Sequence, residues 1–261
     1  WALRRGYETS MARMLRYVAE GGAHAGLSAG NTAALVALSR RELGMISGFS
    51  RPAISTAIPS RGGRRCYLLD LGANVDSPAS RLVDFAVLGA AMAHCIDGID
   101  RPRVALLNVG AEATKGSVTV RETDHLLREC ASSLPFVYLG YAEGGDIFQG
   151  EIDVMVCDGF VGNVTLKASE GLTRMLVERV QWAFESRLCG RLASVLAKPV
   201  LKRLKQELDP VRYNGASLLG LKRIVVKSHG GTRADGFYYA IQRALQEVEH
   251  DLPTQLAKHW A

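Results

Sequence analysis

Apolar, strand-like runs that end in a polar glycine turn occur five times along this chain of 261 residues. The five segments are Ala25–Gly30, Tyr67–Gly72, Val104–Gly110, Val154–Gly159 and Ile224–His229. Ligands of open α/β sheets bind outside the carboxyl ends of the strands, where such turns lie. The sequence therefore predicts that the five turns together build one composite site.

The order of strand-like and helical patterns predicts an α/β fold. Helical patterns at residues 31–43, 80–96, 120–132, 164–187 and 234–249 alternate with the short apolar runs. Further strand-like segments lie at residues 53–59 and 136–140. This alternation is typical of a mostly parallel sheet covered by helices. The runs are continuously apolar, as expected when both faces of a strand are buried. We therefore expect a Rossmann-like, mostly parallel sheet covered by helices.

The length fits one large domain, which buries about three quarters of its unfolded surface. The chain opens at Trp1, already inside a helical pattern that runs to about residue 21. We expect residues 1–261 to form a single α/β domain that lacks its N-terminal strand region.

Residues 183–212 break the alternation and predict an inserted helical hairpin. Between Arg187 and Lys205 the chain has six Lys/Arg residues and no acidic residue, with leucines at helical spacing among them. Such a helix is typical of a segment that contacts a membrane surface or an acidic partner. The candidate contact residues are Leu192, Leu196, Lys198, Leu201, Lys202, Arg203 and Lys205. The alternative is a dimer-forming hairpin with a solvated basic face.

The net charge of +6 also favours an acidic partner. Nucleic acid is not expected, because the basic segment has no aromatic side chain on which bases could stack. The five cysteines are dispersed and no histidines have ligand spacing, so no metal is expected. No Gly-x-Gly-x-x-Gly motif with a downstream acidic residue is present, and no cofactor is expected.

The turns carry residues suited to anion binding. The turn Ser28–Thr32 feeds a helix start, which offers backbone N–H groups and the positive end of the helix dipole. Helix capping explains the same polar residues equally well. Glu112 and Lys115 form either an ion pair or a pair of site residues. His229 ends a strand beside glycines, so a structural and a functional role both stay open.

Six motifs occur along the chain in a characteristic order. They are Ser28–Thr32, Arg51–Ile54, Leu69–Asp76, Leu107–Gly110 with Lys115-Gly116, Cys157–Asn163 and Lys227–Gly230. Together they resemble the phosphate acyltransferase family of bacterial phospholipid synthesis, over residues 1 to about 250. Two departures stand out. The family's N-terminal Asp-Ala-Met-Gly-Gly-Asp motif has no counterpart here, and Ala33 stands where the family usually has glycine.

The resemblance implies a reaction of long-chain acyl-ACP with inorganic phosphate that gives acyl phosphate and free acyl carrier protein (ACP). The acyl phosphate would pass to a membrane glycerol-phosphate acyltransferase. The resemblance also implies a fold similar to phosphotransacetylases and isocitrate/isopropylmalate dehydrogenases. It further implies a cytoplasmic homodimer, peripherally associated with the inner face of the cell membrane, with a single catalytic domain.

Candidate site residues follow from the turns and the resemblance together. The catalytic candidates are Lys227, His229, Lys115 and Asn163. The candidates for binding phosphate or the acyl group are Ser28, Gly30, Asn31, Thr32, Asn74, Asp76, Asn108, Glu112, Asp158, Gly159 and Gly162. We expect Asp70, Asp76 and Asp158 to hold the cations and turns in place. Direct attack of phosphate on the thioester is favoured over an acyl-cysteine at Cys157, which lies inside a strand.

Three alternatives stay open. A phosphate acetyl- or butyryltransferase would use acyl-CoA in place of acyl-ACP. A β-decarboxylating dehydrogenase of the same fold would need the dinucleotide motif that the chain lacks. A non-enzymatic scaffold that recruits ACP to the membrane would have no need of five polar strand ends.

Overall fold

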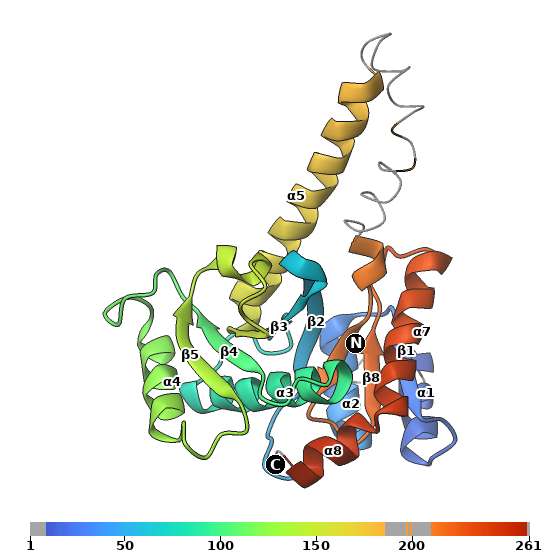
Figure 1. The fold of residues 1–261 in the computed structure, drawn as a ribbon. Helices are drawn as coiled ribbons and strands as arrows, with labels where there is room; N and C mark the ends of the chain where they lie inside the picture. The colour runs from blue at the N-terminus through green and yellow to red at the C-terminus, as the bar shows by residue number, and fades with distance from the viewer. Residues whose placement is uncertain (1–8, 186–196, 198, 200–209, 260–261) are drawn as a thin grey trace.

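The computed structural model describes residues 9–185, 197, 199 and 210–259 (Figure 1). All seven candidate contact residues in the segment 183–212 lie outside this described part, as do residues 1–8 of the expected first helix. The described residues form an α/β structure around one sheet of eight strands.

The sheet is mixed rather than uniformly parallel. Its strands are β1 (Ala25–Ser28), β2 (Ala53–Pro59), β3 (Arg65–Leu69), β4 (Arg103–Leu107), β5 (Val137–Ala142), β6 (Val154–Val156), β7 (Ala216–Leu219) and β8 (Ile224–Lys227). Their order in the sheet is β1-β8-β7-β2-β3-β6-β4-β5. The pairings β1–β8, β3–β6, β6–β4 and β4–β5 are parallel, whereas β8–β7, β7–β2 and β2–β3 are antiparallel.

The antiparallel pairings reverse the strand direction between the two halves of the sheet. Strands β1, β8 and β2 run in one direction, and β7, β3, β6, β4 and β5 run in the other. The carboxyl ends of β1 and β8 therefore point in the direction opposite to those of β3, β4 and β6. The register is staggered, however, so that Leu69 at the end of β3 is level with Val226 near the end of β8, through Ser55 and Ser217. Four of the five turns contribute residues to one cavity, through Gly30, Leu71, Asn163 and Lys227, whereas the turn after β4 does not. The prediction that the turns lie together is therefore confirmed for four turns and wrong for the turn after β4.

Helices cover both faces of the sheet. They are α1 (Ser10–Ala19), α2 (Thr32–Leu43), α3 (Ala79–Asp97), α4 (Val118–Glu129), α5 (Gly159–Glu185), α7 (Ala234–Glu249) and α8 (Leu252–His259). Short 3₁₀ turns lie at η2 (Arg61–Gly63), η3 (Gly144–Phe148) and η4 (Pro210–Tyr213). Residues of α1 and α2 share one buried cluster with Leu166 of α5, while α3, α4 and α8 share another. Helix α5 extends away from the body (Figure 1).

Most predicted elements are confirmed within one to four residues. Two described elements were not predicted, strand β7 and helix α8. Strand β7 has only four residues. The Asn214-Gly215 pair directly before it is a turn signal that marks where the strand begins. Within the described residues the first helix begins at Ser10, where Thr9 caps it by accepting a hydrogen bond from Ala12 N.

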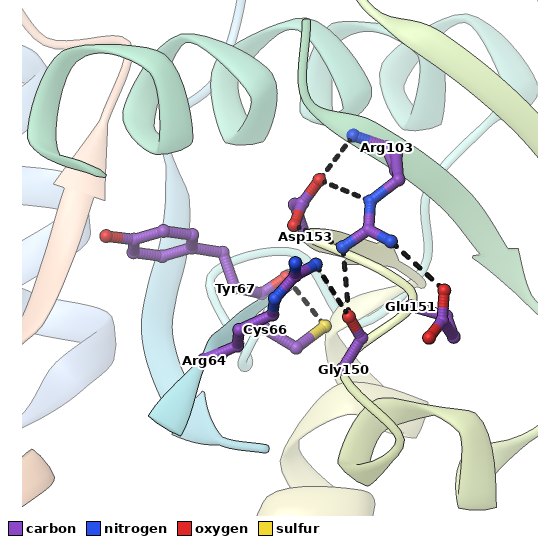
Figure 2. A network of polar contacts seen from close by, with 7 residues as sticks. All are labelled: Arg64, Cys66, Tyr67, Arg103, Gly150, Glu151 and Asp153. Atoms are coloured by element: carbon purple, nitrogen blue, oxygen red, sulfur yellow. Dashed lines mark hydrogen bonds and ion pairs between the residues drawn. The ribbon is translucent and has the colours of Figure 1, made fainter. Parts of the chain in front are cut away.

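A network of polar contacts ties together the amino ends of β3, β4 and β6 (Figure 2). Arg103 donates through Nε and Nη2 to the two carboxylate oxygens of Asp153, at 2.9 Å each. Its Nη2 also donates to Gly150 O at 3.0 Å, and Arg64 donates to the same carbonyl at 3.3 Å. The neighbouring carboxylate raises the pKa of Arg103. Asp153 is buried whereas Arg103 is partly exposed, and the network cross-links the amino ends of these three strands.

Candidate active site

A cavity of about 710 Å³ lies over β2, between α5 and the segment that leads into β7. Its lining comes from seven parts of the chain. They are residues 29–32 at the start of α2, β2 residues 54 and 56–59, Leu71 after β3, Phe148, the face of α5 from Asn163 to Arg174, residues 211 and 213–216, and residues 227 and 229–232 after β8. Polar and cationic groups and apolar side chains both reach it.

The turns after β1 and β8 meet at the cavity, as predicted for these two. Strands β1 and β8 pair in parallel with Ser28 opposite Lys227, and Ser228 N donates to Ser28 O at 2.9 Å. Ser28 Oγ accepts from Gly30 N at 3.1 Å, and Asn31 Oδ1 accepts from Ala34 N at 3.0 Å. Asn31 therefore caps α2, and Ser28 closes the turn that precedes it. What the turn presents to the cavity is the positive N-terminal end of α2.

Lysine side chains reach the cavity from two elements. Lys227 ends β8, is partly buried, and donates from Nζ to Ser228 O. Burial lowers the pKa of Lys227 below its ordinary value, and the positive charge of Lys167 lowers it further. Lys167 lies on α5, one turn after Asn163, and pairs with Glu170 at 2.8 Å. The candidate Lys227 thus lines the cavity, and so does Lys167, which was not among the candidates.

The imidazole of His229 is fixed by its own turn. Gly231 N donates to His229 Nδ1 at 3.1 Å. Because a backbone N–H can only donate, Nδ1 presents its lone pair, and the neutral ring carries its proton on Nε2. This tautomer makes His229 a hydrogen-bond donor through Nε2.

Asn214 organises the turn that carries His229. Its Oδ1 accepts from His229 N at 2.9 Å, and its Nδ2 donates to Ser228 Oγ at 2.9 Å and to Gly236 O at 2.7 Å. Sequence reasoning missed Asn214, although the Asn214-Gly215 pair is a turn signal. Gly215 has φ of 111°, a value that side chains rarely allow.

Asp70 supports the turns after β3 and β6, which border the same cavity through Leu71 and Asn163. It is fully buried and accepts from Ile54 N at 2.8 Å, Ala73 N at 3.2 Å and Asn74 N at 2.6 Å. Burial raises the pKa of Asp70, and these hydrogen bonds oppose the rise. Asp70 holds its turn in place, as predicted, through backbone amides rather than through a cation.

Two predicted binding residues near Asp70 do not line the cavity. Asn74 is buried and donates from Nδ2 to Pro52 O at 2.8 Å and to Asp70 at 3.1 Å. Asp76 is exposed outside the lining. Asn74 therefore supports the turn.

The glycines at the start of α5 allow close backbone packing. A Cβ added to Gly162 would lie 2.0 Å from Asp70 O, and one added to Gly159 would lie 2.6 Å from Asn74 O. Asp158 Oδ1 accepts from Val161 N at 2.9 Å and caps the helix. The structure thus gives Gly159, Gly162 and Asp158 a packing and capping part. The same packing places Asn163 in the cavity lining.

The turn after β4 lies apart from the cavity. Asn108 Nδ2 donates to Gly110 O at 3.1 Å and to Lys115 O at 3.2 Å, so its amide closes the loop on itself. Lys115 Nζ lies 2.9 Å from Glu112 Oε2, and both side chains are about half exposed. The sequence left open whether Glu112 and Lys115 form an ion pair or a pair of site residues, and in the structure they form an ion pair. Asn108, Glu112 and Lys115 are not brought together with Lys227.

Cys157 is poorly placed for nucleophilic attack. Its side chain is 4% exposed, and burial raises the pKa of the thiol well above its usual range. A thiolate is the reactive form, and it is disfavoured here. This geometry agrees with the predicted preference for direct attack by phosphate.

The apolar wall of the cavity was not predicted. It consists of Ile54, Ile58, Leu71, Phe148, Leu166 and Val211. These residues come from five separate segments and have no shared motif. Only their packing in space shows that they form one surface.

The chain matches a known protein family and several of its members. Residues 1–255 match the model of the family described as "Fatty acid synthesis protein". The chain is 53% identical over 255 residues to a phosphate acyltransferase of Stutzerimonas stutzeri, with 98% of this chain and 70% of that protein covered. It is 51% identical to a phosphate acyltransferase of Pseudomonas aeruginosa, with 98% of this chain and 74% of that protein covered.

Solved structures with a similar fold include phosphotransacylases. The phosphotransacetylase of Streptococcus pyogenes has a TM-score of 0.60 at 20% identity, covering 91% of this chain and 67% of that one. EutD phosphotransacetylase from Staphylococcus aureus has a TM-score of 0.57 at 18% identity, with 95% of this chain and 73% of that one covered. These likenesses show the fold alone. The family match and the identity to full relatives together show that the chain belongs to the phosphate acyltransferase family, a group of enzymes of fatty acid and phospholipid synthesis.

Proposed function

We propose that the cavity is where a long-chain acyl group passes from the thioester of acyl-ACP to inorganic phosphate. The observation that carries this proposal is the pairing of cationic groups with an apolar wall in one cavity. Lys227, Lys167 and the N-terminal end of α2 suit a dianion. The wall of Ile54, Ile58 and Phe148 suits a hydrocarbon chain.

Direct attack balances without a covalent enzyme intermediate. An oxygen of monohydrogen phosphate forms a bond to the thioester carbon, and the carbon–sulfur bond breaks. The products are acyl phosphate and the ACP thiol, which receives the proton that the phosphate carried. The enzyme needs to hold the two reactants together and to stabilise the oxyanion.

Each site residue has a part in this mechanism. Lys227 binds the phosphate and stabilises the charge that develops on it. His229 donates from Nε2 to the oxyanion or to the leaving sulfur. Asn163 offers an amide from the first turns of α5. Asp70 and Asp158 keep the start of α5 in place.

The test is the release of ACP thiol from palmitoyl-ACP by the purified protein, with and without inorganic phosphate. We expect release that depends on phosphate, together with a product that hydroxylamine traps as the hydroxamate. Release that is independent of phosphate would remove the proposal. Activity confined to short acyl-CoA would favour a phosphate acetyl- or butyryltransferase, whose fold this chain shares.

Phe148→Ala is expected to weaken the use of long acyl chains selectively. Phe148 lines the cavity and is 40% exposed, so its removal leaves the folded core intact. Loss of about 1.5–2 kcal/mol of apolar contact corresponds to a decrease of about 10–30-fold in kcat/KM for palmitoyl-ACP. The measurement is kcat/KM across a series of acyl lengths. An equal decrease for butyryl-ACP would contradict a chain-binding wall.

The basic segment 183–212 is proposed as the contact with ACP or with an anionic membrane surface. Its sequence supports this through the leucines and the excess of Lys/Arg. Near such a surface each basic residue adds about 1 kcal/mol of attraction. We expect Leu196→Glu to move the protein off anionic liposomes while turnover in solution is retained. Unchanged sedimentation with liposomes would assign the segment to ACP or to a dimer partner.

We also propose the finer organisation that the resemblance implies. Residues 1–261 act as a single catalytic domain of the isocitrate/isopropylmalate dehydrogenase type, with the hairpin protruding from it. The enzyme works as a cytoplasmic homodimer, peripheral to the inner face of the cell membrane. It hands acyl phosphate to a glycerol-phosphate acyltransferase. Size-exclusion chromatography with light scattering tests the dimer.

A further inference from the structure

One side of α5 faces the cavity with charged residues. Asn163, Lys167, Glu170 and Arg174 recur at three- and four-residue spacing and line the cavity. Lys167 Nζ lies 2.8 Å from Glu170 Oε2, and the lysine side chain is about half exposed. The ion pair holds the ammonium group against the wall instead of leaving it to rotate freely in solvent.

A second ammonium group approaches the same cavity from the sheet. Lys227 extends from the carboxyl end of β8, and burial together with the charge of Lys167 disfavours its charged form. Among the described residues that line the cavity, Glu170 is the one carboxylate, and it already pairs with Lys167. Two ammonium groups that repel each other across a cavity are stabilised when an anion lies between them.

We propose that Lys167 and Lys227 together clamp the phosphate, so that Lys167 is a phosphate-binding residue of the reaction. The inference rests on the proposed function and adds a residue that no motif indicates. A dianion offers enough oxygens to accept from both lysines and from the N-terminal end of α2. The thioester is uncharged at its carbonyl and has no need of a second cation. Glu170 acts as a positioning residue through Lys167.

The test compares Lys167→Met with Arg179→Met, which removes a cation farther along the same helix, outside the cavity lining. Loss of one charge-assisted contact is expected to raise the KM for phosphate about tenfold in Lys167→Met. The KM for palmitoyl-ACP and the Tm without ligands should stay unchanged. Lys167→Arg keeps the charge and should restore most of the phosphate affinity, and Arg179→Met should match the wild type.

A binding measurement separates this inference from the proposed function. Inorganic phosphate alone should raise the Tm of the wild type, and Lys167→Met should need about tenfold more phosphate for the same rise. Wild-type protein without phosphate-dependent thiol release would remove the proposed function itself. Phosphate-dependent release in the wild type with an unchanged KM for phosphate in Lys167→Met would overturn only the assignment of Lys167.

Discussion

Replacement of Arg243 by methionine is expected to lower the free energy of unfolding by about 3–5 kcal/mol at neutral pH. Arg243 and Glu247 lie one turn apart on α7, with Nε 3.2 Å from Oε1, and their side chains are 9% and 3% exposed. Arg243 Nε also donates to Ser217 Oγ at 3.2 Å, and its guanidinium lies 5.3 Å from the ring centre of Tyr67. Without Arg243 the buried carboxylate of Glu247 loses its cation.

The loss of stability in Arg243→Met should grow as the pH rises, because the carboxyl group of Glu247 becomes charged without its partner. Burial raises the pKa of Glu247, and the neighbouring Arg243 opposes the rise. In Arg243→Met that opposition disappears, so the folded pKa moves further above the unfolded value of about 4.3. The folded state then binds the proton more tightly than the unfolded state. The penalty is therefore absent below the unfolded pKa and grows as the pH rises toward the folded pKa.

Urea unfolding at pH 5 and pH 8 measures this effect. The difference between wild type and Arg243→Met should be larger at pH 8. The double variant Arg243→Met/Glu247→Leu removes both charges and should regain most of the stability, because an apolar pair can replace a buried ion pair. Equal losses at the two pH values, without recovery in the double variant, would point to lost packing instead of an unpaired carboxylate.

The elements of this fold were predictable from the sequence, but the direction of the strands was not. A continuous apolar run shows that both faces of a strand are buried, and this holds for parallel and antiparallel neighbours alike. The central strands β2 and β7 reverse the direction between the two halves of the sheet. The reversal depends on β7, whose four residues are too few for a periodic pattern.

The candidate site was also predictable only in part. The turns after β1 and β8 were expected to be neighbours, and the structure brings Gly30 and Lys227 to one cavity. The turn that carries Lys115 was expected there too, but it follows β4, which is separated from β8 in the sheet by β7, β2, β3 and β6. Lys167 was missed because a single lysine on a helix is usually solvated. The role proposed for it rests on Lys227, the second cation of the same cavity.

Lys227→Met is expected to cause the largest loss of activity among the variants considered, about 10²–10³-fold in kcat/KM for phosphate. This corresponds to about 2.7–4 kcal/mol of transition-state stabilisation from one preorganised charged group. Stability should stay the same or increase. Burial lowers the folded pKa of Lys227, so its charge costs the folded state free energy at neutral pH, and methionine removes that cost. Loss of activity with retained stability is the behaviour of a functional residue.

The pH profile identifies the group responsible for this loss. Lys227 binds phosphate only when charged, so in the wild type kcat/KM for phosphate should fall as the pH rises through the pKa of Lys227. That fall should occur below the ordinary lysine value of about 10.4, because burial and Lys167 lower the pKa. Lys227→Arg keeps its charge at every accessible pH, so the falling limb should disappear while part of the activity remains. Lys167→Arg serves as the matched control and should retain the limb. If Lys167→Arg abolished the falling limb and Lys227→Arg kept it, the titrating phosphate ligand would be Lys167 on α5, and β8 would only hold the turn of His229 in place.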